Sequence, residues 1–391
     1  MSIQTEISSS RAWNLHTRKH ISLPIHGKST VTCLELDVQR DLIITASDDF
    51  TIAVYTLSTG QFKLTLTGHE GGIWSLASVY SDERSLLVSG STDKTVRIWD
   101  LTIGKCLHVF RGHSGTVRCL AVTSLPPVEG DTSASRMPVI VTGSRDKSVK
   151  VWSIPGNLPN YRMASDEESS ADESSSPYHL LTLIGHTDSI RSISAHGHVA
   201  VSGSYDCTAR IWDIVSGECK RILNGHSEKI YAVVYDPTHD QVYSAGMDGT
   251  INVWSATSGL CLRTLIGHTS LIGLLELSSS EPSPYLVSGS ADATLKVWEP
   301  NTGTLIHTLT TPSVTTSFHH DGKRVLAGGV GMLRMWDIKS GLVVKDLLEG
   351  KVSNVWQVAF DGQWGVCAYV KMGSGQSMLD IWDFGGNDSR L

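Results

Sequence analysis

The amino-acid sequence predicts an all-β protein folded as a single eight-bladed propeller. Two observations support this prediction. A segment of alternating apolar residues that ends in an aromatic residue recurs with a period of about 40 residues, which is typical of propeller blades. The eight segments end at Tyr55, Trp99, Trp152, Trp212, Trp254, Trp298, Trp336 and Trp382. Between them, β-branched stretches and turns such as SGSTDKT and SGSRDKS indicate four short antiparallel strands per repeat and require no helix.

Composition excludes several classes of protein. With 40% hydrophobic and 18% charged residues among 391, the chain is typical of a soluble protein with a large core. Its seven cysteines form no CxxC pair and its first residues lack the apolar run of a signal peptide, so we expect the nucleus, the cytoplasm or both. No apolar stretch approaches the roughly 18 residues that a membrane span needs. The net charge of -7 argues against general nucleic-acid binding, so any anion site must be local.

Five repeats share a polar pattern that could be mistaken for metal or acid–base chemistry. Each repeat has a Gly-His dipeptide and, further along the chain, a Ser or Thr. An Asp stands four residues after that Ser or Thr, and a Trp stands six residues after the Asp. A His that donates to a buried Asp, completed by the hydroxyl and the indole N–H, satisfies groups that are costly to bury, so we interpret these sets as structural and expect no metal or cofactor. The sets are His69, Ser89, Asp93, Trp99; His113, Thr142, Asp146, Trp152; His186, Ser202, Asp206, Trp212; His226, Ser244, Asp248, Trp254; and His268, Ser288, Asp292, Trp298.

Three repeats depart from this pattern. The first offers Gly27 where the His is expected and Tyr55 for the Trp, while it keeps Thr45 and Asp49. Repeats 7 and 8 have Val330 and Gln376 at the Asp position, and we expect these irregular blades to be the least rigid.

The pattern from Gly-His to Trp-Asp resembles the WD-repeat family over residues 20–384. Residues 1–19 and 385–391 are expected to be tails. Because only DFGGNDSRL follows Trp382, the last blade lacks an outer strand, and the segment from His20 to Gly27 is predicted to supply it and close the ring.

Two inserts are expected on the face opposite the Gly-His turns. One, around 163–177, is acidic and rich in serine, so we predict that it is disordered. Its Ser165, Ser169 and Ser170 could be phosphorylated or simply belong to a solvated loop. The second insert runs from Leu125 to Met137.

Residues beside the Gly-His and Ser-x-Asp turns should form a ring around the central channel. Five residues after the His stand Trp74, Arg118, Arg191, Tyr231 and Gly273; one before the Asp stand Thr92, Arg145, Tyr205, Met247 and Ala291. Arg118, Arg145 and Arg191 lie in neighbouring blades, with Lys94 and Lys229 near. These arginines could pair with the Asp residues or lie solvated, or they could bind an anion. The Asp residues already have partners, and converging guanidinium groups repel unless a carboxylate or phosphate joins them. With Trp74, Tyr205 and Tyr231 beside them, this arrangement predicts a phosphopeptide site.

Long local matches at these residues resemble the cell-division-control F-box proteins, the phosphodegron receptors of SCF-type ubiquitin ligases. The matches include GHEGGIWSL, VSGSTDKTVRIWD, GHSGTVRCL, VTGSRDKSVKVW and GHSEKIYAVVYD. The resemblance implies that Arg118, Arg145, Arg191 and Tyr205 hold a phosphothreonine. It also implies that Trp74, Thr92 and Thr116 line a pocket for the proline that follows, while Lys94 stands where that family has Arg.

The 28 residues ahead of Ser29 cannot hold an F-box, so SCF ligase subunits are expected partners only of a longer product. The expected ligands are phosphorylated protein segments of the phosphothreonine-proline type. The alternative is a generic scaffold for protein assembly that does not depend on phosphate. An enzyme is the weakest hypothesis, because no nucleophile–base pair, Gly-rich phosphate loop or metal-spaced cluster is left once the polar sets are explained.

Overall fold

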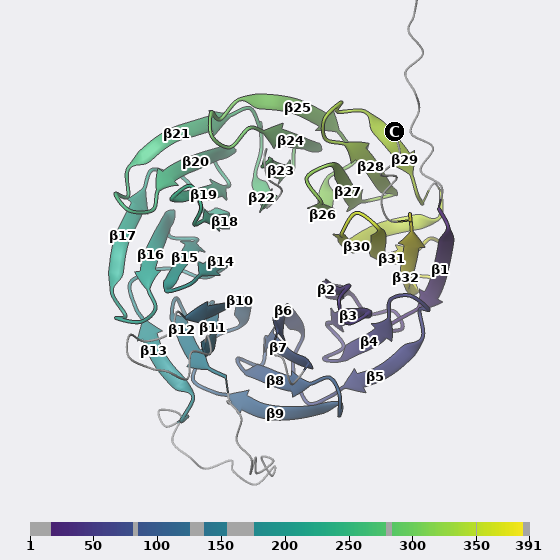
Figure 1. The fold of residues 1–391 in the computed structure, drawn as a ribbon, viewed down its shortest axis with the longest axis horizontal. Coiled ribbons are helices and arrows are strands. Elements are labelled where there is room, and N and C mark those ends of the chain that lie inside the picture. Colours follow the sequence, from purple (N-terminus) through teal and green to yellow (C-terminus); the bar gives the residue numbers. More distant parts are fainter. Residues whose placement is uncertain are drawn as a thin grey trace, which may run out of the picture.

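The chain folds into a closed ring of eight four-stranded antiparallel sheets (Figure 1). The computed structural model describes residues 17–80, 85–125, 137–154, 176–278, 284–348 and 350–385, and within these ranges it contains strands and no helix. The predicted all-β, eight-bladed propeller is confirmed. The serines at 165, 169 and 170, nearly all of the acidic insert and most of the second insert lie outside the described residues.

Each blade consists of four antiparallel strands that follow one another from the channel outwards. Blade 1 contains β2 (Val31–Asp37), β3 (Leu42–Ser47), β4 (Ile52–Thr56) and β5 (Phe62–Leu66), and blade 2 contains β6 (Ile73–Tyr80), β7 (Ser85–Ser91), β8 (Val96–Asp100) and β9 (Lys105–Phe110). Blade 3 contains β10 (Val117–Leu125), β11 (Met137–Ser144), β12 (Val149–Ser153) and β13 (His179–Leu183), and blade 4 contains β14 (Ile190–His196), β15 (Val199–Ser204), β16 (Thr208–Asp213) and β17 (Cys219–Asn224). Blade 5 contains β18 (Ile230–Asp236), β19 (Gln241–Gly246), β20 (Thr250–Ser255) and β21 (Cys261–Ile266), and blade 6 contains β22 (Ile272–Leu277), β23 (Leu286–Ser290), β24 (Thr294–Trp298) and β25 (Leu305–Thr310). Blade 7 contains β26 (Thr315–His320), β27 (Arg324–Gly329), β28 (Met332–Asp337) and β29 (Val343–Asp346), and blade 8 contains β30 (Val352–Phe360), β31 (Trp364–Lys371), β32 (Ser377–Asp383) and β1 (Lys19–Pro24).

The hydrophobic core is divided among the seams between neighbouring blades. Ile44 and Val54 of blade 1, for example, pack against Leu87 and Trp99 of blade 2. The second strand of a blade is buried on both of its faces, as in β3, whereas an outer strand such as β25 is largely exposed. Each blade therefore depends on both neighbours for burial of its sheet.

The ring is closed by β1, which pairs antiparallel with β32 so that Ile21 lies opposite Ile381. The His20 ring stacks on Trp382 at 5.0 Å between centroids, and its Nε2 lies 2.9 Å from the buried carboxylate of Asp380. Ile21 and Leu23 join the apolar cluster between blades 8 and 1. The predicted closure is thus present, and the strand begins at Lys19, one residue before the predicted start.

The five polar sets are hydrogen-bonded networks under one face of the ring. His186 Nδ1 donates to Asp206 at 2.7 Å, its Nε2 lies 2.7 Å from the Ser202 hydroxyl, and the Trp212 indole donates to the same hydroxyl at 2.8 Å. The same bonds recur in blades 2, 3, 5 and 6. Burial works to raise the pKa of Asp206, but the bonds from His186, Thr208 and the Thr187 amide outweigh it and hold that pKa well below its usual range.

Blade 1 also contains such a network, and the prediction that Gly27 takes the His position is wrong. His26 fills it, with Nδ1 2.9 Å from Asp49 and Nε2 2.9 Å from the Thr45 hydroxyl. The dipeptide is reversed here, His-Gly instead of Gly-His, so counting from the glycine shifted the assignment by one residue. His26 adopts a φ of 46°, a left-handed conformation that brings its ring to the same place.

Among the described residues, blades 7 and 8 lack the network. Thr311 precedes β26 where blades 1 to 6 have His, and its hydroxyl lies 2.8 Å from the Ala293 carbonyl and 2.6 Å from the Ser313 carbonyl. Val330 lies in a two-residue turn between Gly329 and Met332, and Gln376 lies in the longer turn after β31. The lower rigidity expected for these blades stays a prediction.

We predict that Trp212→Ala lowers the free energy of unfolding by about 3–5 kcal/mol, because it deletes a fully buried aromatic side chain and one donor of the network. Urea unfolding followed by circular dichroism measures this change. Trp74→Ala, at an indole 38% exposed, is the matched control and should cost far less. Equal losses in the two variants would contradict the structural role of the network.

We further predict that deletion of residues 1–24, which removes β1 and keeps His26, lowers the melting temperature markedly, because β32 and the seam to blade 1 lose their cover. Thermal unfolding measures the loss. Deletion of residues 1–16 leaves β1 in place and should have a much smaller effect. If the chain without residues 1–24 has the melting temperature of the full chain, closure of the ring by β1 does not contribute to stability.

Candidate functional site

The side chains that surround the channel mouth are placed there by β-bulges. In the first strand of every blade the pairing register shifts across one residue shortly after the strand begins. A bulge leaves the extra residue outside the ladder and re-aims its side chain. The bulge residues are Thr32, Trp74, Arg118, Arg191, Tyr231, Gly273, Thr316 and Ser353. Because the first strands surround the axis in Figure 1, these residues form an inner ring.

A second ring lies beside the first, formed by the residue before each network Asp. Its backbone N–H donates to a carbonyl in the loop that enters the same blade: Thr92 to Gly72 at 2.9 Å, Arg145 to Thr116 at 2.9 Å and Tyr205 to Ser189 at 3.0 Å. Met247 and Ala291 make the corresponding bonds in blades 5 and 6. The repeated bond fixes both rings on one face, which we call the rim.

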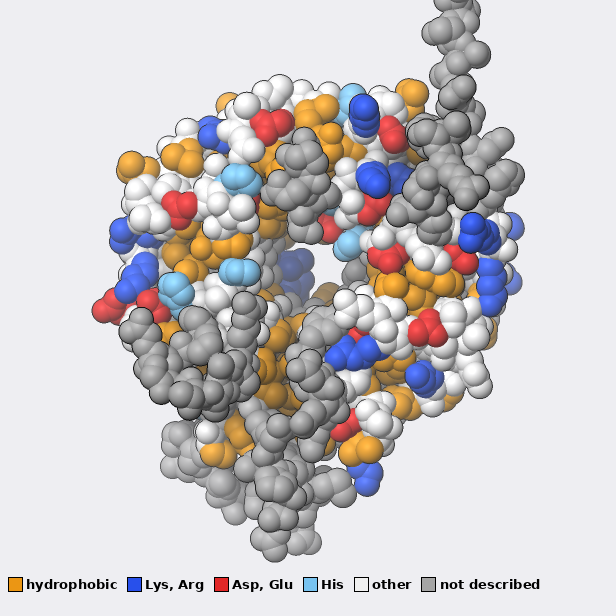
Figure 2. Space-filling model, in the orientation of Figure 1, with side chains coloured by type: hydrophobic (Ala, Val, Ile, Leu, Met, Phe, Trp, Pro, Cys, Tyr) orange, Lys and Arg blue, Asp and Glu red, His pale blue; other side chains and the backbone are white. Residues whose placement is uncertain are grey.

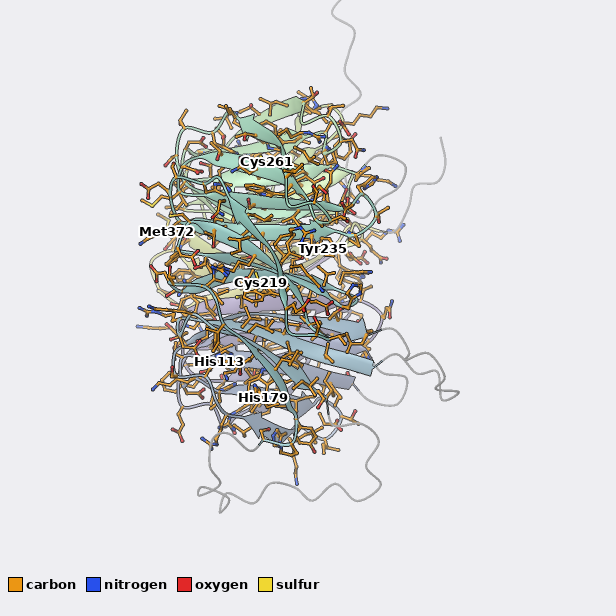
Figure 3. All side chains as sticks on the ribbon, turned by 90° about the vertical axis from the view of Figure 1, so that its left-hand side faces the viewer. His113, His179, Cys219, Tyr235, Cys261 and Met372 are labelled. Carbon is orange, nitrogen blue, oxygen red and sulfur yellow. The ribbon has the colours of Figure 1, made fainter. Side chains whose placement is uncertain are left out.

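The rim and the opposite face are separated by the length of the strands. In the side view of Figure 3, Met372, in the turn between β31 and β32 on the rim side, and Tyr235, near the far end of β18, lie towards opposite sides of the disc. Figure 2 shows the face opposite the rim, where the channel is open at the centre.

In blades 2–5 the two rings bring cations and aromatic rings together. The Arg118 guanidinium lies 4.9 Å from the Trp74 ring and that of Arg191 6.0 Å from the Tyr231 ring. Lys229 Nζ lies 5.0 Å from the Tyr205 ring, and the Tyr205 and Tyr231 rings are 5.2 Å apart. The aromatic faces stabilise the cations where no carboxylate is at hand.

No carboxylate neutralises the three arginines. Within the described ranges, Arg118, Arg145 and Arg191 make no ion pair, while each network Asp is held by its His. The Nε atoms of Arg118 and Arg191 are buried and have no hydrogen-bond acceptor. Burial first, and then the charges of Arg191 and Arg145, lower the pKa of Arg118, so the cluster disfavours its own charge. An anion at this place would relieve the repulsion and supply the missing acceptors.

Tyr205 and Tyr231 complete the cluster as polar aromatic groups. Burial, followed by the neighbouring Tyr205 hydroxyl, raises the pKa of Tyr231, while Arg191 and Arg118 act in the opposite direction. The Tyr231 phenol is therefore protonated near neutral pH and can donate a hydrogen bond.

The residues implied for a proline pocket adjoin the arginines. The Arg118 guanidinium lies over the half-exposed indole of Trp74. The Thr92 hydroxyl lies against Gly71. The Thr116 carbonyl accepts a hydrogen bond from the backbone N–H of Arg145. Lys94 is exposed in the turn after Asp93 with a φ of 72°. It lies on the rim, but the structure gives no contact between Lys94 and the three arginines.

Sequence reasoning missed three rim residues of blades 1 and 7. Asp48 directly precedes Asp49, Thr32 is the bulge residue of β2, and Val330 lies in the turn between β27 and β28. They were overlooked because the two offsets were applied only to the five repeats with the full polar pattern. Asp48 is exposed and accepts the Thr30 amide at 2.8 Å. Val330 and Met247 are 57% and 50% exposed, so the rim of blades 5 and 7 carries exposed apolar side chains.

Neither a metal centre nor a membrane-spanning helix is found in the part of the chain that the structure describes. No three His, Cys, Asp or Glu side chains there are grouped so that they could hold a metal ion. None of its elements is a helix of the length and apolar character needed to cross a membrane.

Comparison with known proteins agrees with the ring and its polar networks. The family model of the WD domain, G-beta repeat, matches residues 18–56, 60–100, 104–153, 178–213, 217–255 and 259–299, and the chain belongs to this WD-repeat family. Within it, the chain is 39% identical over 377 residues to cell division control protein 4 of Candida albicans, covering 93% of this chain and 53% of that protein.

Other relatives show the same partial coverage. Cell division control protein 4 of Saccharomyces cerevisiae is 35% identical over 385 residues, covering 92% of this chain and 47% of that protein. WD repeat-containing protein pop1 of Schizosaccharomyces pombe is 35% identical, covering 95% and 49%. The chain thus spans about half the length of these relatives. Among solved structures, the computationally designed Ika8 protein has a TM-score of 0.70 and 25% identity, covering 92% of this chain and 98% of that chain.

Proposed function

We propose that the rim of this propeller binds phosphorylated segments of other proteins, in which a phosphothreonine is followed by proline. The observation that carries the proposal is the cluster of Arg118, Arg145 and Arg191, which has no acidic partner among the described residues and contains two buried, unsatisfied Nε atoms. A phosphate carries nearly two negative charges at neutral pH and three acceptor oxygens, and it matches the planar donor fork of arginine.

The surroundings of the cluster fit the rest of such a ligand. The Tyr205 hydroxyl is available to donate to the phosphate, and Lys229 is held on the Tyr205 ring beside it. Next to Arg118, the Trp74 indole offers an apolar surface flanked by the small polar side chains of Thr92 and Thr116. Such a surface suits the ring of proline. Lys94 adds charge at the edge without the bidentate geometry of Arg.

We further propose that binding serves substrate recognition for an SCF-type ubiquitin ligase, which would direct phosphorylated proteins of the nucleus or cytoplasm to degradation. This step rests on the similarity to the cell division control proteins, of which the chain covers about half. Recruitment of the ligase would need an F-box, so affinity capture from cells expressing the full gene product, probed for the SCF adaptor subunit, tests it. Absence of the adaptor would leave a phosphopeptide receptor without the ligase.

A second candidate function is protein assembly that does not depend on phosphate. The exposed apolar side chains of Met247, Val330 and Met372 on the rim favour it, because an apolar rim surface can take an unmodified partner. The two functions differ in one measurement, the ratio of affinities for a phosphorylated peptide and its unmodified form.

We predict that single changes of Arg118, Arg145 or Arg191 to Ala weaken binding of a phosphothreonine-proline peptide about 10- to 100-fold, because each charge-assisted bond contributes roughly 1.5–3 kcal/mol. Two such changes should abolish measurable binding. Titration of a fluorescent phosphopeptide, with its unphosphorylated form in parallel, measures both effects.

The control for these variants is Lys339→Ala, an exposed cation in the turn after β28 and away from the rim. Its affinity should equal that of the parent. If the arginine variants bind like the parent, or the parent does not distinguish the two peptides, the receptor function fails and the assembly function remains.

We also predict that Lys94→Arg strengthens binding of the same phosphopeptide by a few fold, since Arg adds a planar fork at a rim position that already holds a cation. By the same reasoning, Arg145→Lys should lose nearly as much affinity as Arg145→Ala. The titration above measures both. A lysine at residue 145 that preserves the affinity would show that charge alone decides binding.

A further inference from the structure

The turn between β3 and β4 carries an aromatic residue that the fold does not require. Phe50 adopts a φ of 70° and its side chain is 44% exposed. A bulky residue in the left-handed region is unfavourable, and an exposed ring recovers little by burial. The residues at the same turn position in blades 2–6 are charged or small: Lys94, Lys147, Cys207, Gly249 and Ala293. Among blades 1–6, Phe50 is the only aromatic residue at this turn position.

The repeat shows what lies beside Phe50. Cys207, its counterpart in blade 4, is within range of the charges of Glu228 and Lys229, which follow the network His of blade 5 by two and three residues. In blade 2 the corresponding loop residues are Gly71 and Gly72, which follow His69. The loop beside the Phe50 turn thus has two glycines at the positions where blade 5 offers two charged side chains beside the Cys207 turn.

The two glycines connect Phe50 to the proposed proline pocket. A Cβ atom on Gly72 would lie 3.4 Å from the Asp48 Cα and 3.6 Å from Trp74 Nε1. Gly72 therefore lies between the β3–β4 turn and the Trp74 indole on the rim. We call the surface formed by Phe50, Gly71, Gly72 and Trp74 the apolar shelf, and the exposed Asp48 borders it. Its two aromatic side chains are both more than a third exposed.

We propose that the apolar shelf binds an apolar side chain of the ligand two or three residues after the phosphothreonine. This inference rests on the proposed function and narrows its ligands to segments in which apolar residues follow the proline. With the phosphate at blades 3 and 4 and the proline at blade 2, the ligand chain continues towards blade 1. Successive Cα atoms are 3.8 Å apart, so two further residues reach the shelf. Phe50 acts there by direct contact with the ligand.

The test uses two fluorescent phosphopeptides with the same phosphothreonine-proline core, one with leucine and one with serine at the second and third positions after the phosphothreonine. The parent should bind the leucine peptide about 3- to 10-fold more tightly, as expected for partial burial of an apolar side chain. Phe50→Asn should remove this difference and leave the affinity for the serine peptide within about twofold.

A melting curve of Phe50→Asn separates binding from structure. Asn tolerates the left-handed conformation, so its melting temperature should equal or exceed that of the parent. Phe62→Asn is the matched control, because Phe62 is an exposed phenylalanine of the same blade on the outer strand β5. It should keep the preference for leucine.

The outcomes distinguish the two proposals. If neither phosphopeptide binds, the proposed function and the shelf are both overturned. If the serine peptide binds as tightly as the leucine peptide, or if Phe50→Asn keeps the preference, the phosphate site stands and the shelf is overturned.

Discussion

Every other feature of this molecule depends on the closure of the ring by β1 and β32. Each sheet is covered on both sides only if both of its neighbours are present, and blades 8 and 1 become neighbours through six residue pairs between segments at opposite ends of the chain. The contact of His20 with Trp382 and Asp380 joins side chains 360 positions apart. Closing a loop of that length costs about 5 kcal/mol of chain entropy, which the pairing and the apolar seam between blades 8 and 1 must exceed.

The hydrogen-bonded networks convert this closed ring into a rigid rim. Each ties a turn between the second and third strands to the loop that enters the blade, and the bulge then aims one side chain towards the channel. The cost of bringing Arg118, Arg145 and Arg191 together without a carboxylate is met by the fold around them. Under the proposed function, an anion would meet arginines that are already in place, and binding would need little reorganisation.

The number of blades, their strands and the networks of blades 2–6 could be predicted from the sequence because each follows from a local pattern. Gly27 was assigned wrongly because a reversed dipeptide and a left-handed His26 occupy the same space as the usual order. Counting from the network His located Trp74, Arg118 and Gly273, but the bulge that aims them could not be predicted, since a bulge depends on the register between two strands and leaves no fixed residue type. The stacking of Arg118 on Trp74 and of Lys229 on Tyr205 likewise depends on the spacing between blades, which no single repeat encodes.

The position of β1 has a consequence for synthesis on the ribosome. It is the first strand of the ring to be made, and its partner β32 ends at Asp383. At 5–20 residues per second, roughly 20–70 s separate the two. During that time the apolar side chains of Ile21 and Leu23 have no sheet to join, while blades 1 to 7 can form in succession behind them. The nascent chain must therefore keep this strand available and unaggregated while the other strands of the ring are translated, so closure of the ring uses the first of its strands to be made.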